Sequence, residues 1–305
     1  MNATTPAERI AALAYDYVAK AKERPLACNL CGSRRRAETL ARRDRYGYPA
    51  TLVVCRRCGL AWISPRLTAA GYSDFYAGVY RPLVSAYHGR RIDADTVQHE
   101  QRDYAAELAG FLAPLLPFPP ATILDVGGST GAVAGVLAAQ TGARATILDP
   151  APDELAAARA AGMETIGGLA EDFDPDGRRW DLVLLCQTID HLLDVRATLA
   201  ALRRMTADDG RAFVDILDAD LMLERTGSIE HVVKIDHPYY LTRDTAVAFF
   251  GLAGYAVLAE RESGDGHRGF ALAPCSPSAP DWPALAASAK ALLSISEDQS
   301  KLPSL

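Results

Sequence analysis

Four cysteines near the start of the chain have the spacing of metal ligands. They form two Cys-x-x-Cys pairs, Cys28 with Cys31 and Cys55 with Cys58, and a glycine follows each pair. Two such pairs can close a tetrahedral shell of four thiolates around Zn²⁺, which leaves no position open for a substrate. The spacing therefore predicts a structural zinc site, which would stabilise a segment too small to bury much apolar area by itself.

A glycine-rich segment, ILDVGGSTG at residues 123–131, lies between an apolar run and a run with helical spacing. Gly127 and Gly131 permit a tight turn and a close approach of the backbone to a ligand, and the following helix offers free N–H groups. The spacing differs from the dinucleotide fingerprint because Asp125 lies at the end of the strand. A carboxylate there would repel a pyrophosphate, but it suits the cationic amino group and sulfonium of S-adenosylmethionine (SAM).

Two further acidic residues follow the next two apolar runs. Asp149 ends the second run, where a carboxylate can accept bonds from both hydroxyls of a ribose. After the third run, Asp172 can accept from an adenine amino group and Phe173 can cover the base. Each acid alone could also cap a helix or form a turn. Three acids at the carboxyl ends of consecutive strands favour a cofactor site at that edge of a sheet.

Histidine is the side chain best suited to proton transfer near neutral pH, and two of the six histidines lie where chemistry is expected. His191 follows the fourth apolar run, where it could orient a substrate or cover SAM; capping or packing of a helix is the equal alternative. His237 follows Asp236 in a long connection after the fifth run. An acid beside a histidine raises its basicity, so we expect His237 to be a general base supported by Asp236, with Tyr239 or Tyr240 lining the pocket.

Apolar and helical runs alternate regularly from residue 121 onward. The apolar runs predict seven strands, at residues 121–126, 143–149, 163–166, 181–186, 210–217, 255–262 and 267–274. Helices are expected at residues 130–140, 152–161, 194–206 and 242–251. This alternation predicts an α/β, Rossmann-like fold with a seven-stranded, mostly parallel sheet. Only SGDG separates the last two strands, which predicts a hairpin and therefore an antiparallel last strand.

The chain before this alternating region predicts smaller units. Apolar residues at helical spacing predict a helix over residues 7–23 that ends before Pro25, and another over residues 96–112. We expect four segments: an N-terminal helix with a zinc-ribbon-like module at 1–66, a helical connector at 67–118, a SAM-binding domain at 119–275, and a short tail at 276–305 with at most one helix at 283–294.

Residues 121–274 together resemble the class I SAM-dependent methyltransferases. The resemblance rests on the glycine-rich segment, the acids after the second and third strands, and the segment DLVLLCQTIDHLLD after the fourth. It implies that the glycine-rich segment contacts the methionine part of SAM, that the second acid binds the ribose, and that Gln187 lies on the sulfonium side. The implied cofactor residues are Asp125, Gly127, Gly128, Ser129, Gly131, Asp149, Pro150, Asp172, Phe173 and Gln187.

The cysteine segment extends the resemblance toward the N-terminus. CNLCGS, VVCRRCGLAWISPRLT and DFYAGVY resemble the zinc module of bacterial sugar C-methyltransferases of deoxysugar and surface-glycan pathways. The resemblance implies that Tyr76 and Tyr80 line the substrate pocket, although core packing is the other role open to each tyrosine. It also places Asp236 and His237 where those enzymes carry a Glu-His pair. Those enzymes carry a further C-terminal domain, which we do not expect here because only a short tail follows residue 275.

The balance of charges bears on the partner. The formal net charge of −6 disfavours nucleic acid as the main partner. The segment 34–66 nevertheless holds nine arginines, which form either a solvated surface or, in part, a site for a phosphate-bearing substrate; Lys234 and His231 could also contact a diphosphate. The expected function is SAM-dependent C- or O-methylation of a small molecule, with a nucleotide-linked sugar as the leading substrate.

Two other functions remain open from the sequence: an RNA methyltransferase whose zinc module grips the nucleic acid, and a SAM-binding scaffold protein without catalysis. CQTID stands where many nucleic-acid methyltransferases have an NPPY-like motif, which disfavours the first. The opening residues carry charges every few positions and no long apolar run, so we expect neither a secretory signal nor a membrane anchor, and a cytoplasmic location.

Overall fold

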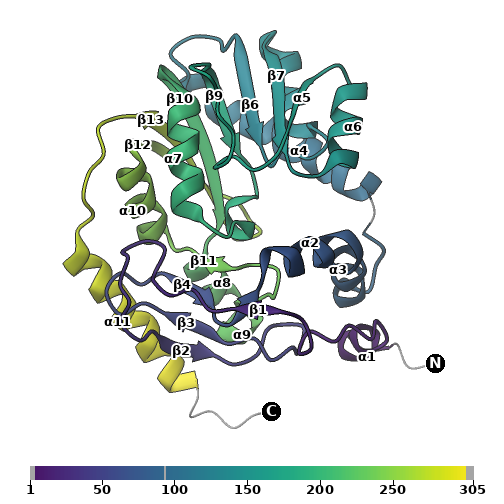
Figure 1. Cartoon of the computed structure of the whole chain (residues 1–305), viewed down its shortest axis with the longest axis vertical. Coiled ribbons are helices and arrows are strands. Elements are labelled where there is room, and N and C mark those ends of the chain that lie inside the picture. The colour runs from purple at the N-terminus through teal and green to yellow at the C-terminus, as the bar shows by residue number, and fades with distance from the viewer. Residues whose placement is uncertain (1–3, 93, 300–305) are drawn as a thin grey trace. The chain divides into compact units, whose positions relative to one another are not determined.

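The computed structural model describes residues 4–92 and 94–299 (Figure 1). Contacts between Cα atoms divide the chain into two compact units. The first, termed the cysteine unit, comprises Met1–Val97, Ala219–Thr245 and Asp281–Leu305, and the second, the sheet unit, comprises Gln98–Asp218 and Ala246–Pro280. The four consecutive segments expected from the sequence, with boundaries at residues 66, 118 and 275, are a different division and stay a prediction.

The sheet unit contains a seven-stranded sheet with the strand order β12-β13-β10-β9-β6-β7-β8. Neighbouring strands from β10 to β8 pair in parallel, whereas β13 pairs antiparallel with both β10 and β12. The predicted α/β fold and its antiparallel last strand are thus confirmed. The strands are β6 (Thr122–Val126), β7 (Arg144–Asp149), β8 (Glu164–Gly167), β9 (Trp180–Leu185), β10 (Thr206–Leu217), β12 (Tyr255–Glu262) and β13 (His267–Pro274).

The helices of this unit follow their strands as predicted. They are most of α4 (Ala94–Leu112), α5 (Ala132–Thr141), α6 (Pro152–Ala160), α7 (Val195–Met205) and most of α10 (Arg243–Ala253), with single turns η1 (Ala113–Leu115) and η2 (Ile189–His191). Helix α7 begins where Asp194 accepts a hydrogen bond from the amide of Ala197 at 3.0 Å, satisfying an amide that the helix itself cannot. Its buried Leu199 and Leu202 share one face because they are three residues apart.

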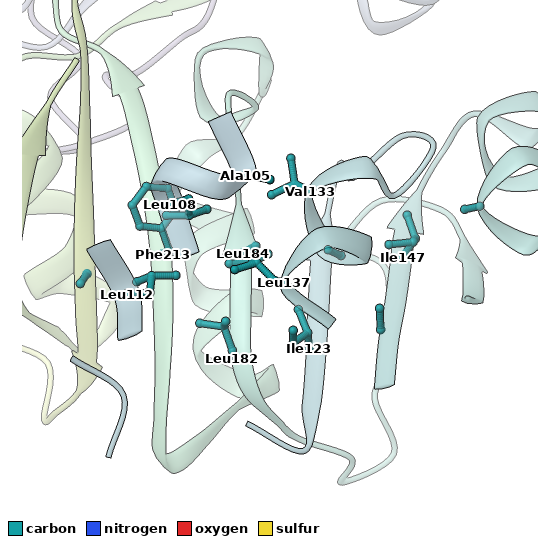
Figure 2. Close-up of a cluster of buried hydrophobic side chains, with 14 of the residues drawn as sticks. Ala105, Leu108, Leu112, Ile123, Val133, Leu137, Ile147, Leu182, Leu184 and Phe213 are labelled. Atoms are coloured by element: carbon teal, nitrogen blue, oxygen red, sulfur yellow. The ribbon is translucent and has the colours of Figure 1, made fainter. Parts of the chain in front are cut away.

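One side of the sheet is covered by α4, α5 and α6 over a continuous apolar core (Figure 2). Leu182 and Leu184 of β9 both belong to it, because alternate side chains of a strand point to the same face. Leu108 of α4 and Leu137 of α5 pack against them, together with Phe213 of β10. Truncating a fully buried leucine such as Leu184 to alanine costs about 2–5 kcal/mol. This core holds the carboxyl ends of the strands, and so the loops that follow them, in fixed positions.

The cysteine unit contains a four-stranded sheet of order β11-β4-β3-β2, in which all neighbours are antiparallel, and a two-stranded pair β1-β5. Strand β11 comes from a distant part of the sequence and completes one edge. The strands are β1 (Lys22–Glu23), β2 (Glu38–Ala41), β3 (Leu52–Val54), β4 (Ala61–Ile63), β5 (Arg66–Leu67) and β11 (Tyr239–Tyr240). The helices are α1 (Pro6–Ala11), α2 (Ala69–Gly78), α3 (Tyr80–His88), α8 (Ala219–Thr226), α9 (Ile229–Val232) and α11 (Trp282–Gln299).

The predicted helix over residues 7–23 is wrong beyond residue 11. Helix α1 has a capping box between Thr5 and Glu8, but the chain turns at Ala14, whose φ is +50°. Lys22 then pairs with Leu67 as part of β1. Of the apolar residues that produced the helical spacing, Ile10 and Tyr17 are buried but Ala14 and Val18 are exposed, so these residues do not form one buried helical face. The predicted helix at 283–294 is confirmed as part of the longer α11.

Candidate active site

The glycine-rich loop leaves β6 in a conformation that demands glycine. Gly127 has a φ of +68°, and a Cβ at this position would lie 2.6 Å from Cγ2 of Thr188. Its amide donates to the carbonyl of Leu148 at 2.8 Å, which ties the loop to the end of β7. A Cβ on Gly128 would lie 2.6 Å from the carboxyl carbon of Asp125. The backbone is therefore packed directly against side chains, and no other residue fits at either position.

Asp149, at the end of β7, is held by the glycine-rich loop and by the turn that follows it. Its Oδ2 accepts from the amide of Ser129 at 2.9 Å, and its Oδ1 accepts from the amide of Ala151 at 2.8 Å, so the intervening Pro150 is fixed as well. Burial raises the pKa of Asp149, and these two amides oppose the rise. Each carboxylate oxygen can accept a second hydrogen bond, which suits the hydroxyls of a ribose. The hydroxyl of Ser129 donates to Glu154 at 2.8 Å, a partner that the sequence did not reveal.

Asp125 is a buried carboxyl beside the same loop. Its side chain lies in a residue that is 1% exposed, and among the residues that the structure describes its Oδ1 has no hydrogen-bond partner. Burial raises its pKa to about 7; the amide of Ala134 opposes this, while the charges of Asp149 and Asp215 add to it. An unsatisfied buried acceptor is costly. A cationic group such as the amino group of SAM would satisfy it, so the residues fit the predicted cofactor.

A third buried acid, Asp215 of β10, was missed by the sequence analysis. Its Oδ1 accepts from the amide of Gln187 at 2.5 Å and its Oδ2 accepts from the hydroxyl of Tyr104 at 2.7 Å. Burial raises the pKa of Asp215. Gln187 itself has a φ of +49°, an uncommon value for a residue with a Cβ. Asp215 therefore fixes the turn that carries the predicted sulfonium-side residue. An acid inside the apolar run GRAFVDIL was the available signal.

The remaining predicted residues of the sheet unit lie on connections between strands. His191 is in the turn η2, and its amide donates to the carbonyl of Thr188 at 3.0 Å. Asp172 is exposed in the loop between β8 and β9. Phe173 packs against Trp180, the first residue of β9, with ring centroids 6.5 Å apart. The structure thus groups Phe173 with the amino end of that strand, and its role in covering adenine stays a prediction.

In the cysteine unit, the four predicted ligands converge on one point. Sγ of Cys28 lies 3.5 Å from Sγ of Cys58, and Sγ of Cys31 lies 3.6 Å from Sγ of Cys55. All four sulfurs lie within 4.8 Å of one another. Four thiolates at about 2.3 Å from a tetrahedral Zn²⁺ are separated by about 3.8 Å. The donor set and its spacing therefore fit zinc.

Each cysteine pair is a tight turn closed by the glycine that follows it. The amides of Gly32 and Gly59 donate to the carbonyls of Cys28 and Cys55, both at 2.9 Å, and both glycines have positive φ. Helix α11 contacts the second cysteine turn: the guanidinium of Arg57, between Cys55 and Cys58, lies 4.9 Å from the ring centre of Trp282.

The cysteine unit also brings together the predicted base and the predicted substrate tyrosines. Nε2 of His237 lies 3.5 Å from Oδ2 of Asp236, and both residues are at most 5% exposed. The hydroxyl of Tyr76 donates to the backbone carbonyl of Asp236 at 2.9 Å, and the rings of Tyr76 and Tyr80 lie 5.4 Å apart. Burial raises the pKa of Tyr76 well above its usual value, so this phenol is neutral. The ring of Tyr240 lies 6.3 Å from that of His237.

Several contacts hold the connection that carries His237. The hydroxyl of Tyr240 donates to the carbonyl of Lys234 at 2.7 Å, and Tyr239 pairs with Trp62 of β4. Asp44, another acid that the sequence analysis missed, accepts from the amide of Ile235 at 3.2 Å. Burial raises the pKa of Asp44 to about 7, although its backbone hydrogen bonds oppose this.

Comparison with known proteins identifies the class. Residues 97–260, more than half of the chain, match the family described as Methyltransferase domain. The chain therefore belongs to the methyltransferase-domain family, which confirms the predicted class of enzyme and supports SAM as the methyl donor.

One relative is a ubiquinone biosynthesis O-methyltransferase of Methylobacterium sp. (strain 4-46). The two sequences are 36% identical over 104 residues, which is 30% of this chain and 41% of that protein, so the chain spans less than half of its relative's length.

Two solved structures are similar to this chain at low sequence identity, and the first of them shows that the fold is shared. The PH0226 protein of Pyrococcus horikoshii OT3 is 18% identical, with a TM-score of 0.50 over 57% of this chain and 91% of that chain. Magnesium protoporphyrin IX methyltransferase of Synechocystis PCC 6803, solved with bound SAH, is 14% identical, with a TM-score of 0.48 over 60% of this chain and 88% of that chain. In the part of the chain that the structure describes, no helix is long and apolar enough to cross a membrane.

Proposed function

We propose that this chain transfers a methyl group from SAM to a small molecule, a sugar nucleotide or a related glycan or natural-product precursor. The observation that carries the proposal is Asp125, a buried carboxyl beside a loop that has no room for a Cβ at Gly127 or Gly128. A buried carboxylate in this position destabilises the folded protein unless a cation pairs with it, and the amino group of SAM is a suitable cation.

SAM supplies an electrophilic methyl group on a sulfonium. Asp149 would hold the ribose hydroxyls, and the Asp125 carboxylate would hold the amino group. Gln187, in the turn that Asp215 fixes through the Gln187 amide, would face the sulfonium side of SAM. Asp172 would accept from the adenine amino group, and Phe173 would cover the base. These residues position the donor, and in-line displacement depends mainly on such positioning.

His237 is the general base of the proposal. The Asp236 carboxylate 3.5 Å from Nε2 stabilises the imidazolium that forms when His237 takes a proton from the methyl acceptor. Nearly complete burial of both side chains strengthens this attraction because the surroundings have a low dielectric constant. His191 is a second candidate for orienting the acceptor.

Tyr76, Tyr80, Tyr239 and Tyr240 line the acceptor site in this proposal. The neutral phenol of Tyr76 is a hydrogen-bonding group that does not compete with the base for protons. The partial match to an O-methyltransferase supports oxygen as the acceptor atom. The resemblance of the cysteine segment to sugar C-methyltransferases supports a sugar as the molecule that carries it.

Zn²⁺ is the ion that we place among the four cysteines, where it has a structural role. Free thiols of this kind persist in a reducing compartment, so we propose that the enzyme acts in the cytoplasm.

The proposal is tested by incubating the purified protein with SAM and a panel of nucleotide sugars, and detecting S-adenosylhomocysteine together with a methylated product. Replacing His237 with asparagine removes the base, and we expect kcat/KM to fall by about 10²–10⁴-fold while the affinity for SAM is unchanged. His99, an exposed histidine of α4, provides the matched control His99→Asn, which should behave as wild type.

Three outcomes count against parts of the proposal. Wild-type turnover by His237→Asn removes the base assignment. SAM binding without methyl transfer to any acceptor favours a scaffold role. Salt-sensitive RNA binding at low micromolar protein, with methylated RNA as the product, replaces the small molecule by nucleic acid.

A further inference from the structure

An arginine-lined hollow of about 370 Å³, here the arginine hollow, lies on the four-stranded sheet of the cysteine unit. Its floor includes Thr39, Val53 and Trp62, which are direct neighbours across β2, β3 and β4. The hollow therefore extends across one face of this sheet. Its volume is within the range of about 300–1,000 Å³ that is typical of small-molecule sites.

The lining of the arginine hollow offers many donors and no acidic side chain. Arg24, Arg34, Arg35 and Arg36 line it, together with the hydroxyls of Thr51 and Ser64, and its lining includes no aspartate or glutamate. No hydrogen bond or ion pair between any of these four guanidinium groups and another described residue is found in the structure. By contrast, the neighbouring Arg56 is paired with Glu38.

Arg35 and Arg36 have the most central position. They also line two adjoining hollows of about 410 Å³ and 630 Å³ on the same unit. Guanidinium groups without a carboxylate partner, gathered around one space, are the donor set that binds the oxygens of a phosphate in pairs. Glu38 lines the larger of the two adjoining hollows, but its carboxylate is paired with Arg56 and not with Arg35 or Arg36.

We infer that the arginine hollow binds the phosphate groups of a small molecule, through the guanidinium groups of Arg24, Arg34, Arg35 and Arg36. The ligand is a nucleoside diphosphate or a free diphosphate, since both present the same oxygens. Phosphate binding by the arginine hollow does not depend on the proposed function. Only the further step, in which this ligand is the nucleotide part of the methyl acceptor, rests on it.

The cysteine cluster connects this site to the metal. Cys28 itself lines the arginine hollow, and the amide of Cys28 donates to the carbonyl of Ser33, the residue that precedes the three consecutive arginines. A metal bound by Cys28 therefore fixes the base of the segment that carries Arg34, Arg35 and Arg36. Removing zinc should release this segment and weaken phosphate binding.

The experiment measures binding of uridine diphosphate and of inorganic pyrophosphate to the zinc-loaded full chain by calorimetry, without SAM. In the variant Arg35→Gln/Arg36→Gln we expect affinity to fall about tenfold or more, because two charge-assisted contacts are lost. The matched control is Arg42→Gln/Arg204→Gln, which removes two exposed arginines outside the hollow and should leave affinity unchanged. Zinc content and circular dichroism verify that both variants are folded.

Comparison of the two ligands shows whether the site recognises a nucleotide or diphosphate alone. Tighter binding of uridine diphosphate assigns the site to a nucleotide, and equal binding assigns it to diphosphate alone. The inference is overturned if neither ligand binds, if the control variant weakens binding as much as the test variant, or if an RNA oligonucleotide displaces both. This binding assay contains no SAM and is therefore independent of methyl transfer. If phosphate binds but no methyl transfer is found, the proposed function is refuted and the inference about the arginine hollow still holds.

Discussion

Replacing Asp125 with asparagine should stabilise the SAM-free protein and weaken SAM binding at the same time. The substitution keeps the shape of the side chain and removes its negative charge. Asp125 is buried and packs directly against Gly128, so an asparagine of the same shape should occupy the same space. The charge, and not the packing, is what this variant changes.

The size of the effect follows from burial. The pKa of Asp125 is raised to about 7, whereas the carboxyl of an unfolded aspartate titrates near about 3.9. A difference of about three in pKa corresponds to about 4 kcal/mol. Because the folded carboxyl binds its proton more tightly than the unfolded one, ionisation costs stability. The cost begins as the pH rises above about 4 and is complete above about 7, so between pH 5 and pH 8 it grows by about 2–3 kcal/mol.

The assay is thermal unfolding of wild type and Asp125→Asn at pH 5 and pH 8 without SAM. The variant should gain about 2–3 kcal/mol more over wild type at pH 8 than at pH 5, which is roughly 5 °C in Tm for a chain of this size. Calorimetry should show that the same substitution, which stabilises the fold, weakens SAM binding. Wild-type affinity for SAM should rise between pH 6 and pH 7.5 as the carboxyl ionises, whereas the variant should bind about tenfold more weakly or worse and lose this dependence.

The control is Asp209→Asn, which removes an exposed acid. It should change neither the pH dependence of Tm nor the affinity for SAM. Equal Tm differences at pH 5 and pH 8 would show that Asp125 is not the buried titrating group. Unchanged SAM affinity in Asp125→Asn would refute the assignment of its carboxylate to the cofactor.

Three further changes test other parts of the structure. Gly127→Ala should abolish detectable SAM binding in calorimetry while circular dichroism stays unchanged, because the added methyl meets Thr188 and the backbone needs positive φ; full affinity would contradict the loop assignment. Cys58→Ser, like chelation, should lower the Tm and the zinc measured by mass spectrometry, which wild type should hold at one ion per chain; a metal-free wild type with the same Tm would count against the zinc site. Tyr104→Phe removes a donor to Asp215 and should cost about 1–3 kcal/mol in chemical unfolding, with Tyr15→Phe as control; no loss would mean that another donor replaces it.

Much of the sheet unit was predictable because its determinants are local. Strand and helix boundaries agree to within a few residues, since short apolar runs alternate with runs of helical spacing. The convergence of the four cysteines was also predictable, because each pair is a local turn and the ligand chemistry requires that the pairs meet.

What the sequence did not reveal depends on contacts between distant residues. The hydrogen bonds of Asp215 to Tyr104 and to the amide of Gln187 join three separate elements. Asp44 is fixed by the amide of Ile235, far along the chain. The helix expected over residues 7–23 failed for the same reason: β1 pairs with β5, and this tertiary pairing overrides local helical spacing.

The pairing of β11 with β4 also affects how the protein is made. Strand β4 is synthesised before the seven-stranded sheet, but its partner Tyr239–Tyr240 is synthesised only after five of the seven strands of that sheet, β6 to β10. Until then the edge of β4 has unpaired backbone groups, which are prone to pair with other chains. Early capture of zinc by the cysteine pairs would hold β3 and β4 in register during this interval. Zinc supply during translation should therefore determine the yield of native protein, and a fragment that ends before residue 239 should aggregate even when zinc is present.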